Sequence, residues 1–310
     1  MKITFVIPVY NERETLEPLV EGITQYVTPH PHRILLVDDG STDGSHEVMC
    51  ALRKRFDTVE IIRLRGNFGK SSALAAGFAR ADGDLVFTMD SDLQDEPKEI
   101  PRFLEKLAEG YDVVCGWKAV RHDPVHKTVP SRLYNGFVSW LFKVPLHDVN
   151  CGFKLLRIEV VRNIQLYGEM HRLIPVLAHS LNYRVAEIPV EHHRRRYGKS
   201  KYGFERFSRG ALDVLTMWFL CRYRHAPGHF FGKIGLYQVL AGWVGIIAGA
   251  MLWVWGGPQP LLGPILVIAG LVVASTGTLT VSLGLMAELV LRHFVRIDPA
   301  LYIADDPRPR

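Results

Sequence analysis

Two aspartates one residue apart lie in the segment Met89-Asp90-Ser91-Asp92-Leu93-Gln94, directly after an apolar run. We expect both carboxylates on the same side of an extended segment, and the amide oxygen of Gln94 continues the same spacing. Mg²⁺ and Mn²⁺ prefer oxygen ligands and commonly bridge one or two carboxylates to substrate phosphates. The segment therefore predicts a divalent-metal site that holds a diphosphate, with Asp90, Asp92 and Gln94 as ligands.

Two further aspartate pairs have different contexts. Asp38-Asp39 follows an apolar run and precedes Gly40–Gly44, so either carboxylate is a candidate to hydrogen-bond the ribose or base of a nucleotide. Ser41, Thr42 or Asp43 can instead cap the next helix, and the two roles are compatible. Asp82-Gly83-Asp84 precedes an apolar run, which predicts a solvated turn at the opposite edge of a sheet.

The segment Gly66–Ser72 contains a Gly-Lys-Ser sequence but is not a P-loop. That motif needs a glycine five residues before the Gly-Lys pair, and Leu64 occupies this position. We exclude a P-loop NTPase. Lys70 at a helix start is still a candidate contact for a donor phosphate, because helix N-termini attract phosphate.

Short runs rich in Val, Ile, Leu and Phe alternate with stretches of helical spacing through the first 116 residues. The expected strands are Ile3–Ile7, Arg33–Val37, Val59–Leu64, Leu85–Met89 and Val113–Cys115, with a later one at Arg184–Val190. The expected helices are Glu12–Tyr26, Asp43–Phe56, Ser71–Ala81 and Pro97–Glu109. This alternation indicates an α/β fold with a mostly parallel sheet covered on both faces. Ligands bind at the carboxyl ends of such strands, so three strand ends should converge on one acidic crevice.

Two apolar runs near the C-terminus, Ile234–Trp255 and Leu261–Ala287, contain no charged side chain and are each long enough to cross a bilayer. Arginines and a lysine lie before the first run and after the second, whereas the connector Gly256–Pro260 has no charge. The positive-inside rule predicts that both ends are cytoplasmic. Gly245-x-x-x-Gly249 offers a close-packing face for another helix, or reflects the abundance of glycine in membrane helices.

Several features restrict the remaining possibilities. The N-terminal apolar run is too short for a signal peptide, so we expect the bulk of the chain in the cytoplasm. Phe204–Tyr223 predicts an amphipathic helix in the membrane interface, and a plain core helix is the alternative. The net charge of +5 resides mainly at Arg194–Arg196 and beside the apolar runs, which indicates anionic lipid and not nucleic acid. Four widely spaced cysteines exclude a zinc ribbon or disulfide framework.

Six ordered segments together resemble glycosyltransferase family 2. These segments are Pro8–Glu12, Asp38–Ser41, Asn67–Lys70, Asp90–Gln94, Asp148–Phe153 and Arg195–Lys201. Within the family the chain is similar to the polyprenyl-phosphate glycosyltransferases, the dolichol-phosphate mannosyltransferase-like group. The resemblance covers residues 1–230, and the paired C-terminal spans match the bacterial undecaprenyl-phosphate branch.

The resemblance implies a GT-A type nucleotide-diphospho-sugar transferase fold followed by a two-helix transmembrane hairpin. The implied division is a cytoplasmic catalytic domain at 1–203, amphipathic interfacial helices at 204–232, transmembrane helices at 233–291 and a cytoplasmic tail at 292–310. The chain would then be an integral protein of the inner (cytoplasmic) membrane, with the catalytic domain and both termini in the cytoplasm.

The resemblance also implies roles for individual residues. Pro8, Tyr10, Glu12 and Asp39 would hold the nucleoside, while Asp90, Asp92 and Gln94 would hold metal and donor diphosphate. Asp148 falls near the acceptor, and His171, Arg172, Arg195, Ser200 and Lys201 would meet phosphates of the lipid acceptor or donor. Lys118 would contact the donor where relatives often have arginine after Gly-Ser. Here the sequence is Gly116-Trp117-Lys118, and this departure leaves its role open.

The expected reaction is inverting transfer of a single sugar from a nucleotide-sugar to a polyprenyl phosphate, undecaprenyl or dolichyl, with Mg²⁺ or Mn²⁺. We favour a UDP-sugar donor, with GDP-mannose as the alternative. A lipid monophosphate is mostly ionised near neutral pH, because its second pKa is about 6. Asp148 is therefore either a base or an orienting group, and metal and alignment carry most of the catalysis.

Other expectations concern partners and alternatives. The expected partners are membrane lipids and further copies of the chain in a dimer or tetramer. A processive polysaccharide synthase is one alternative, but the Gln-x-x-Arg-Trp motif usual in such enzymes is absent. Transfer to protein or to a lipid hydroxyl, and a non-catalytic nucleotide-sugar sensor or scaffold, are the others.

Overall fold

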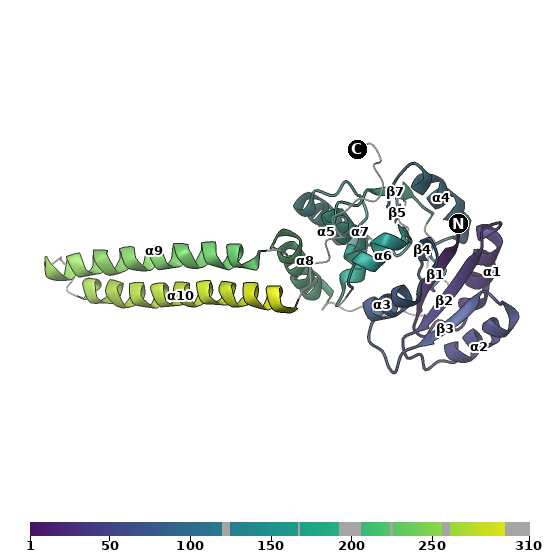
Figure 1. Cartoon of the computed structure of the whole chain (residues 1–310), viewed down its shortest axis with the longest axis horizontal. Helices are drawn as coiled ribbons and strands as arrows, with labels where there is room; N and C mark the ends of the chain where they lie inside the picture. Colours follow the sequence, from purple (N-terminus) through teal and green to yellow (C-terminus); the bar gives the residue numbers. More distant parts are fainter. Residues whose placement is uncertain (120–124, 167, 192–205, 224–225, 256–260, 295–310) are drawn as a thin grey trace. The chain divides into compact units, whose positions relative to one another are not determined.

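The computed structural model describes residues 1–119, 125–166, 168–191, 206–223, 226–255 and 261–294 (Figure 1). The chain divides into two compact units, Met1–Trp218 and Phe219–Arg310. The first unit contains the sheet and the helices that cover it, and the second contains two long helices. The boundary between the two units falls inside the segment Phe204–Tyr223, which we predicted to be an interfacial helix.

The first unit is built on a seven-stranded sheet with the order β3-β2-β1-β4-β6-β5-β7. The strands are β1 Ile3–Val9, β2 His32–Asp38, β3 Val59–Arg63, β4 Leu85–Thr88, β5 Val113–Trp117, β6 Lys154–Arg157 and β7 Val185–Pro189. Every neighbouring pair is parallel except the two that involve β6, which runs antiparallel to β4 and β5. The predicted mostly parallel sheet is therefore confirmed.

The sequence did not predict β6. This strand has only four residues, Lys154-Leu155-Leu156-Arg157, and three of them are buried. A buried lysine at its start breaks the apolar pattern by which the other strands were identified. Its pairing partners β4 and β5 supply the hydrogen bonds that make it a strand.

Helices connect the strands and follow the last one, and several of them pack on the two faces of the sheet. They are α1 Leu16–Val27, α2 Ser45–Arg55, α3 Lys70–Arg80, α4 Ile100–Ala108, α5 Val125–Phe142, α6 Ile158–Asn163, α7 Ile174–Ser180 and α8 Arg206–Tyr223, with 3₁₀ turns η1 Pro97–Glu99 and η2 Met170–Leu173. Helices α1, α2 and α4 share one buried apolar cluster with alternate residues of β1, such as Phe5 and Ile7. Helix α3 packs on the other face, where a Cβ at Gly77 would lie 2.2 Å from Val6. Only a glycine allows this close approach.

Four phenylalanines tie the centre of the sheet to the segment before β6. The rings of Phe5 and Phe87 stack with their centroids 5.1 Å apart, and Phe103 and Phe153 lie 4.3 Å apart. Phe87 also contacts both Phe103 and Phe153. The carboxyl end of β4 and the loop before β6 are therefore held next to each other by the core.

The second unit contains α9, Pro227–Val254, and α10, Leu262–Phe294 (Figure 1). By length and composition Pro227–Val254 and Leu262–Val290 are each able to cross a membrane. Most of their side chains are exposed, unlike those of a soluble core helix. Helix α9 begins earlier than the predicted apolar run because Pro227 suits a first helical turn. The two apolar helices predicted from the sequence are present.

Glycines at seven-residue intervals form the contact between α9 and α10. They are Gly228, Gly235, Gly242 and Gly249 on α9, and Gly263, Gly270, Gly277 and Gly284 on α10. A Cβ at Gly242 would lie 2.6 Å from the carbonyl oxygen of Gly270, and one at Gly235 would lie 2.6 Å from that of Gly277. A seven-residue repeat keeps one face of each helix against its partner. The backbones are therefore in direct contact along the hairpin.

This contact refines the expectation for Gly245-x-x-x-Gly249. A Cβ at Gly249 would lie 2.7 Å from the carbonyl oxygen of Gly263, so Gly249 does pack against another helix, which is α10. A Cβ at Gly245 would lie an ordinary 3.4 Å from Gly270. The close-packing motif is thus the seven-residue repeat and not the four-residue one.

We predict that Gly242→Val destabilises the hairpin, whereas Gly245→Val does not. Overpacking a tight contact typically costs about 1–3 kcal/mol, and only the first substitution places its Cβ closer to the α10 backbone than ordinary van der Waals contact allows. The thermal midpoint of the purified protein in detergent should fall for Gly242→Val alone. Equal midpoints for both variants would contradict the described contact.

Candidate functional site

The loops after β1 and β2 are joined by hydrogen bonds. The Asn11 amide donates to the Ser41 hydroxyl over 3.1 Å, and the Thr42 amide donates to the Asn11 side-chain oxygen over 2.8 Å. The Glu12 amide donates to the Ser45 hydroxyl over 3.0 Å. Glu12 is buried in this arrangement, which explains why α1 begins only at Leu16 and not at Glu12 as predicted.

The carboxyl end of β1 is also tied to that of β4. The Ser91 hydroxyl donates to the carbonyl oxygen of Pro8 over 3.0 Å. Pro8 and Tyr10 are half-buried at this edge. The structure thus brings together the strand ends that carry Pro8, Tyr10 and Asp90, as the sequence predicted for one crevice.

Asp38 and Asp39 hold loop backbones in this structure. The fully buried Asp38 carboxylate accepts the Ser41 amide over 2.8 Å and lies 3.3 Å from the imidazole of His46. The Asp39 carboxylate accepts the amides of Phe68 and Gly69 over 2.7 and 2.9 Å. Both aspartates therefore position the loops after β2 and β3, and a contact with a donor stays a prediction.

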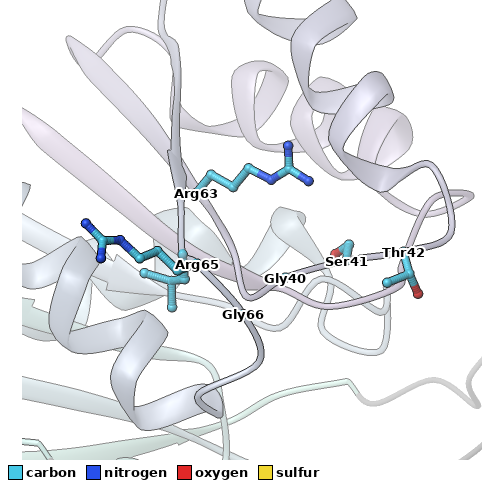
Figure 2. Close-up of a pocket in the computed structure, with 7 residues that line it drawn as sticks. Gly40, Ser41, Thr42, Arg63, Arg65 and Gly66 are labelled. Carbon is cyan, nitrogen blue, oxygen red and sulfur yellow. The ribbon is translucent and has the colours of Figure 1, made fainter.

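A pocket of about 470 Å³ lies at the carboxyl ends of β2 and β3. It is lined by Gly40, Ser41, Thr42, Arg63, Leu64, Arg65 and Gly66. Figure 2 shows Gly40–Thr42 in the loop after β2, Arg63 at the end of β3, and Arg65 and Gly66 in the loop that follows, with the two arginine side chains pointing away from each other. The pocket is next in sequence to Asp39, so it adjoins the predicted nucleoside site.

Asp90 lies between a lysine and a glycine. The ammonium of Lys70, the first residue of α3, forms an ion pair with Asp90 Oδ1. A Cβ at Gly152 would lie 2.6 Å from Asp90 Oδ2, so only a glycine fits there. Burial raises the pKa of the Asp90 carboxyl, but the charge and hydrogen bond of Lys70, together with the charge of Lys118, outweigh it and hold this pKa well below its usual range. Asp90 is therefore ionised at neutral pH.

Asp92 and Gln94 lie in a turn and not in the extended segment that we expected. The chain bends at Ser91–Asp92, and Leu93 adopts a left-handed conformation with φ of 56°. The Gln94 amide donates to the buried Asp92 carboxylate over 3.2 Å. The strand ends earlier than predicted, at Thr88, and the turn keeps Asp90, Asp92 and Gln94 within a few residues of one another.

This turn suits a cation that is only partly enclosed by protein. Among the residues that the structure describes, no three His, Cys, Asp or Glu side chains gather to form a closed metal site. Mg²⁺ and Mn²⁺ commonly take one or two carboxylates and complete their shell with water and substrate phosphates. The donor set of Asp90, Asp92 and Gln94 fits this kind of binding.

Lys118 is held near the same acidic turn. Its ammonium lies 3.6 Å from Asp95, whose side chain is almost fully buried. Burial lowers the pKa of Lys118, but Asp95, Asp90 and Asp148 outweigh it and raise the pKa above its usual value. Lys118 is therefore a permanent positive charge at the crevice.

Asp148 is held from both sides by residues that the sequence did not single out. The side-chain amide of Asn135, on α5, donates to Asp148 Oδ1 over 3.1 Å. Glu187, on β7, accepts the backbone amides of His147 and Asp148 over 2.8 and 3.4 Å and also pairs with the His147 ring. That ring stacks on Trp117 at 4.3 Å between centroids. In the sequence, Glu187 stands out only as a charged residue in the middle of the predicted strand Arg184–Val190.

His171 packs against the start of α3. Its backbone amide donates to the Ser71 hydroxyl over 3.1 Å, and its Nδ1 lies 2.9 Å from the same oxygen. The Ser71 hydroxyl therefore contacts both the backbone and the ring of His171. Burial and the charges of Lys70 and Arg172 lower the pKa of His171 well below its usual value, so the ring is neutral at neutral pH.

Arg172 forms an ion pair with Glu169 over 2.7 Å and is buried. Asp213, on α8, is electrostatically coupled to both residues. Burial and Glu169 raise the pKa of Asp213 against the opposing effect of Arg172. The structure thus gives Arg172 internal carboxylate partners, and a phosphate contact there stays a prediction.

The remaining predicted residues divide into two groups. Arg195, Ser200 and Lys201 lie outside the described residues. Asp82 and Asp84 form an exposed turn at the amino end of the sheet, where Asp84 accepts the Lys2 amide over 2.7 Å, as predicted. Lys154, which was not predicted, is fully buried, and its ammonium contacts the Cys151 carbonyl in the loop beside Asp90.

We predict that Glu187→Gln loosens the His147–Asp148 backbone. Hydrogen bonds to a charged group are worth about 1.5–3 kcal/mol, so amide hydrogen exchange in a peptide spanning these residues should accelerate by roughly tenfold or more. Glu60→Gln, which removes an exposed partner of Arg33, is the matched control. Unchanged exchange in the Glu187 variant would show that this carboxylate does not hold the loop.

Comparisons with known proteins agree with this geometry. The model of the family described as Glycosyl transferase family 2 matches residues 4–165. A dodecaprenyl-phosphate galacturonate synthase from Rhizobium johnstonii is 35% identical over 314 residues, covering 96% of this chain and 90% of the relative. An undecaprenyl-phosphate 4-deoxy-4-formamido-L-arabinose transferase from Yersinia enterocolitica is 31% identical, covering 97% of this chain and 92% of the relative.

Solved structures share the fold. Glucosyl-3-phosphoglycerate synthase from Mycobacterium tuberculosis in complex with phosphoglyceric acid superposes with a TM-score of 0.56 at 18% identity, covering 71% of this chain and 79% of that one. The same enzyme in complex with Mn²⁺, UDP and glucosyl-3-phosphoglycerate gives 0.55 at 17% identity, with the same shares covered. At this identity the likeness concerns the fold, which is GT-A-like. With a family match over half its length and relatives aligned along nearly all of it, the chain belongs to glycosyl transferase family 2.

Proposed function

We propose that this protein transfers a single sugar, with inversion, from a nucleotide-sugar to a polyprenyl phosphate at the cytoplasmic face of the inner membrane. The observation that carries the proposal is the Asp90–Asp92 turn beside Lys70, in a chain that ends in two apolar helices. Relatives named for dodecaprenyl- and undecaprenyl-phosphate products, aligned over nearly the whole chain, support the acceptor class.

The strand order supports a layout for the donor. The carboxyl ends of β3, β2, β1 and β4 follow one another across the sheet. A base in the pocket at β2 and β3 would direct the ribose towards β1 and the diphosphate towards Asp90 and Asp92 at β4. Pro8, Tyr10, Glu12 and Asp39 lie along this path. The sugar would then extend towards Asp148.

Exposed apolar side chains of the first unit support a membrane-bound acceptor. Leu133, Phe137 and Trp140 recur at helical spacing on α5, and all three are more than half exposed. Leu212 and Leu215 on α8 are exposed in the same way. Leu, Phe and Trp on one face of a helix are typical of contact with the membrane interface. Because α5 also carries Asn135, the same helix would join the lipid surface to Asp148.

The protein residues would act mainly by alignment and charge. An oxygen of the acceptor phosphate forms the new bond to the anomeric carbon, while the bond from that carbon to the nucleoside diphosphate breaks. A bound Mg²⁺ or Mn²⁺ would neutralise the diphosphate that leaves, held by Asp90, Asp92 and Gln94. Lys70 and Lys118 add positive charge on the same side. Asp148, with Asn135 and Glu187 fixing it, would orient the acceptor or accept its last proton.

Transfer to lipid phosphate is the direct test. The purified protein, incubated with undecaprenyl phosphate, Mn²⁺ and a donor panel of UDP-glucose, UDP-galactose, UDP-galacturonate, UDP-amino-arabinose and GDP-mannose, should yield a lipid heavier by one sugar. Asp92→Ala should lower turnover by roughly 100-fold, about 3 kcal/mol. Asp84→Ala, in the matching sequence at the other sheet edge, should leave it unchanged. Failure with every donor would contradict the acceptor class, and metal-dependent turnover by Asp92→Ala would contradict the metal site.

Asp148→Asn should lower kcat by roughly 10²–10⁴-fold, because the amide can neither accept a proton nor supply the charge that orients the acceptor. The KM for the donor should change little. Asp112→Asn is a matched control, because Asp112 is buried and accepts the Arg184 amide away from the crevice. Full turnover by the Asp148→Asn variant would contradict the proposed role of Asp148 in the reaction.

A further inference from the structure

Lys70 occupies the carboxylate that the proposed metal would use. Its ammonium pairs with Asp90 Oδ1, and the two side chains are only 23% and 30% exposed. The whole carboxylate of Asp90 also lies against the backbone of Gly152, where a Cβ would be only 2.6–2.8 Å from its carbon and both of its oxygens. A cation that approaches Asp90 Oδ1 therefore meets the Lys70 ammonium there.

The backbone around Lys70 is fixed, so only its side chain is able to leave. The amide of Gly69 is held by Asp39 over 2.9 Å, and the hydroxyl of Ser71 is engaged by His171 over 2.9 Å. Between these two anchors, Lys70 begins α3. A lysine side chain is a flexible four-carbon stem with a compact charge, so it can change partners without any movement of the helix.

A diphosphate offers Lys70 that new partner. Phosphate groups are favoured at helix N-termini, and Lys70 is the first residue of α3. Two positive charges sharing one carboxylate oxygen repel each other, whereas a metal on Asp90 and an ammonium on the diphosphate do not. The negative charge of Asp90 is then balanced by Lys70 before the metal and diphosphate bind, and by the metal after they bind.

We propose that Lys70 is the resident counter-ion of Asp90, competes there with the divalent cation, and moves to the donor diphosphate, so that nucleotide and metal bind cooperatively. The inference rests on the proposed nucleotide-sugar site but not on the identity of the acceptor. It is a positioning role for Lys70, beyond a fixed contact with a donor phosphate. Reciprocity requires UDP to strengthen metal binding by the same factor by which metal strengthens UDP binding.

The test measures Mn²⁺ binding by electron paramagnetic resonance on the full-length protein in detergent, with and without UDP. In the wild type, UDP should strengthen Mn²⁺ binding within the roughly 5- to 150-fold range of ordinary coupling. Lys70→Met should bind Mn²⁺ roughly tenfold more tightly without UDP, and should lose most of the strengthening by UDP. Lys106→Met, which breaks a similar lysine–carboxylate pair with Glu109 on α4, should change neither quantity.

Lys70→Gln provides a second variant of similar length, and the thermal midpoint verifies that each variant is folded. Unchanged or weaker Mn²⁺ binding by both Lys70 variants without UDP would overturn the proposal, because a merely structural ion pair gives that result. Unchanged coupling to UDP would also overturn it. If Mn²⁺ and UDP bind as expected but no lipid is glycosylated, the proposed acceptor fails while the role of Lys70 stands.

Discussion

The negative charge of Asp90 is the constraint on which the rest of the site depends. A carboxylate placed at a buried sheet edge is costly unless positive charge and hydrogen-bond donors surround it. Here Lys70 pairs with it directly, Lys118 adds positive charge nearby, and Gly152 leaves room for the carboxylate. Each of these residues comes from a different element, so the elements have to meet at the end of β4.

Hydrogen bonds from side chains to loop backbones fix that meeting point. Asp39 holds the loop that leads into α3, Ser91 ties β4 to β1, and Glu187 holds the backbone of Asp148. Such contacts leave few unsatisfied backbone groups in a buried loop region. They also mean that residues identified as ligand contacts hold the loops of the site in place. Asp39 is the plainest case, because both of its oxygens accept loop amides.

The hairpin uses a different principle. Between two helices in lipid there is little hydrophobic driving force, so close backbone packing takes its place. The glycines that recur every seven residues on both helices allow this approach, and the long apolar side chains are left on the outside. The second unit thus combines a tightly packed seam with an outer surface suited to acyl chains.

The sequence by itself determined the α/β class, the five N-terminal strands, the two apolar helices and the family. Continuous apolar runs, strand-end aspartates and charge-free stretches are local patterns, and local patterns are readable along the chain. The sequence did not predict β6. This strand has only four residues, and the buried Lys154 interrupts the apolar pattern that identified the other strands.

Only the tertiary structure decided which charges meet. Lys70 and Asp90 are twenty residues apart, Asn135 and Asp148 come from a helix and a loop, and Glu187 reaches back to Asp148 from β7. No spacing rule connects these positions, because their proximity follows from the order of the strands and the packing of the core. Most of the charged residues of the site could be identified from the sequence, but which of them are in contact follows only from the fold.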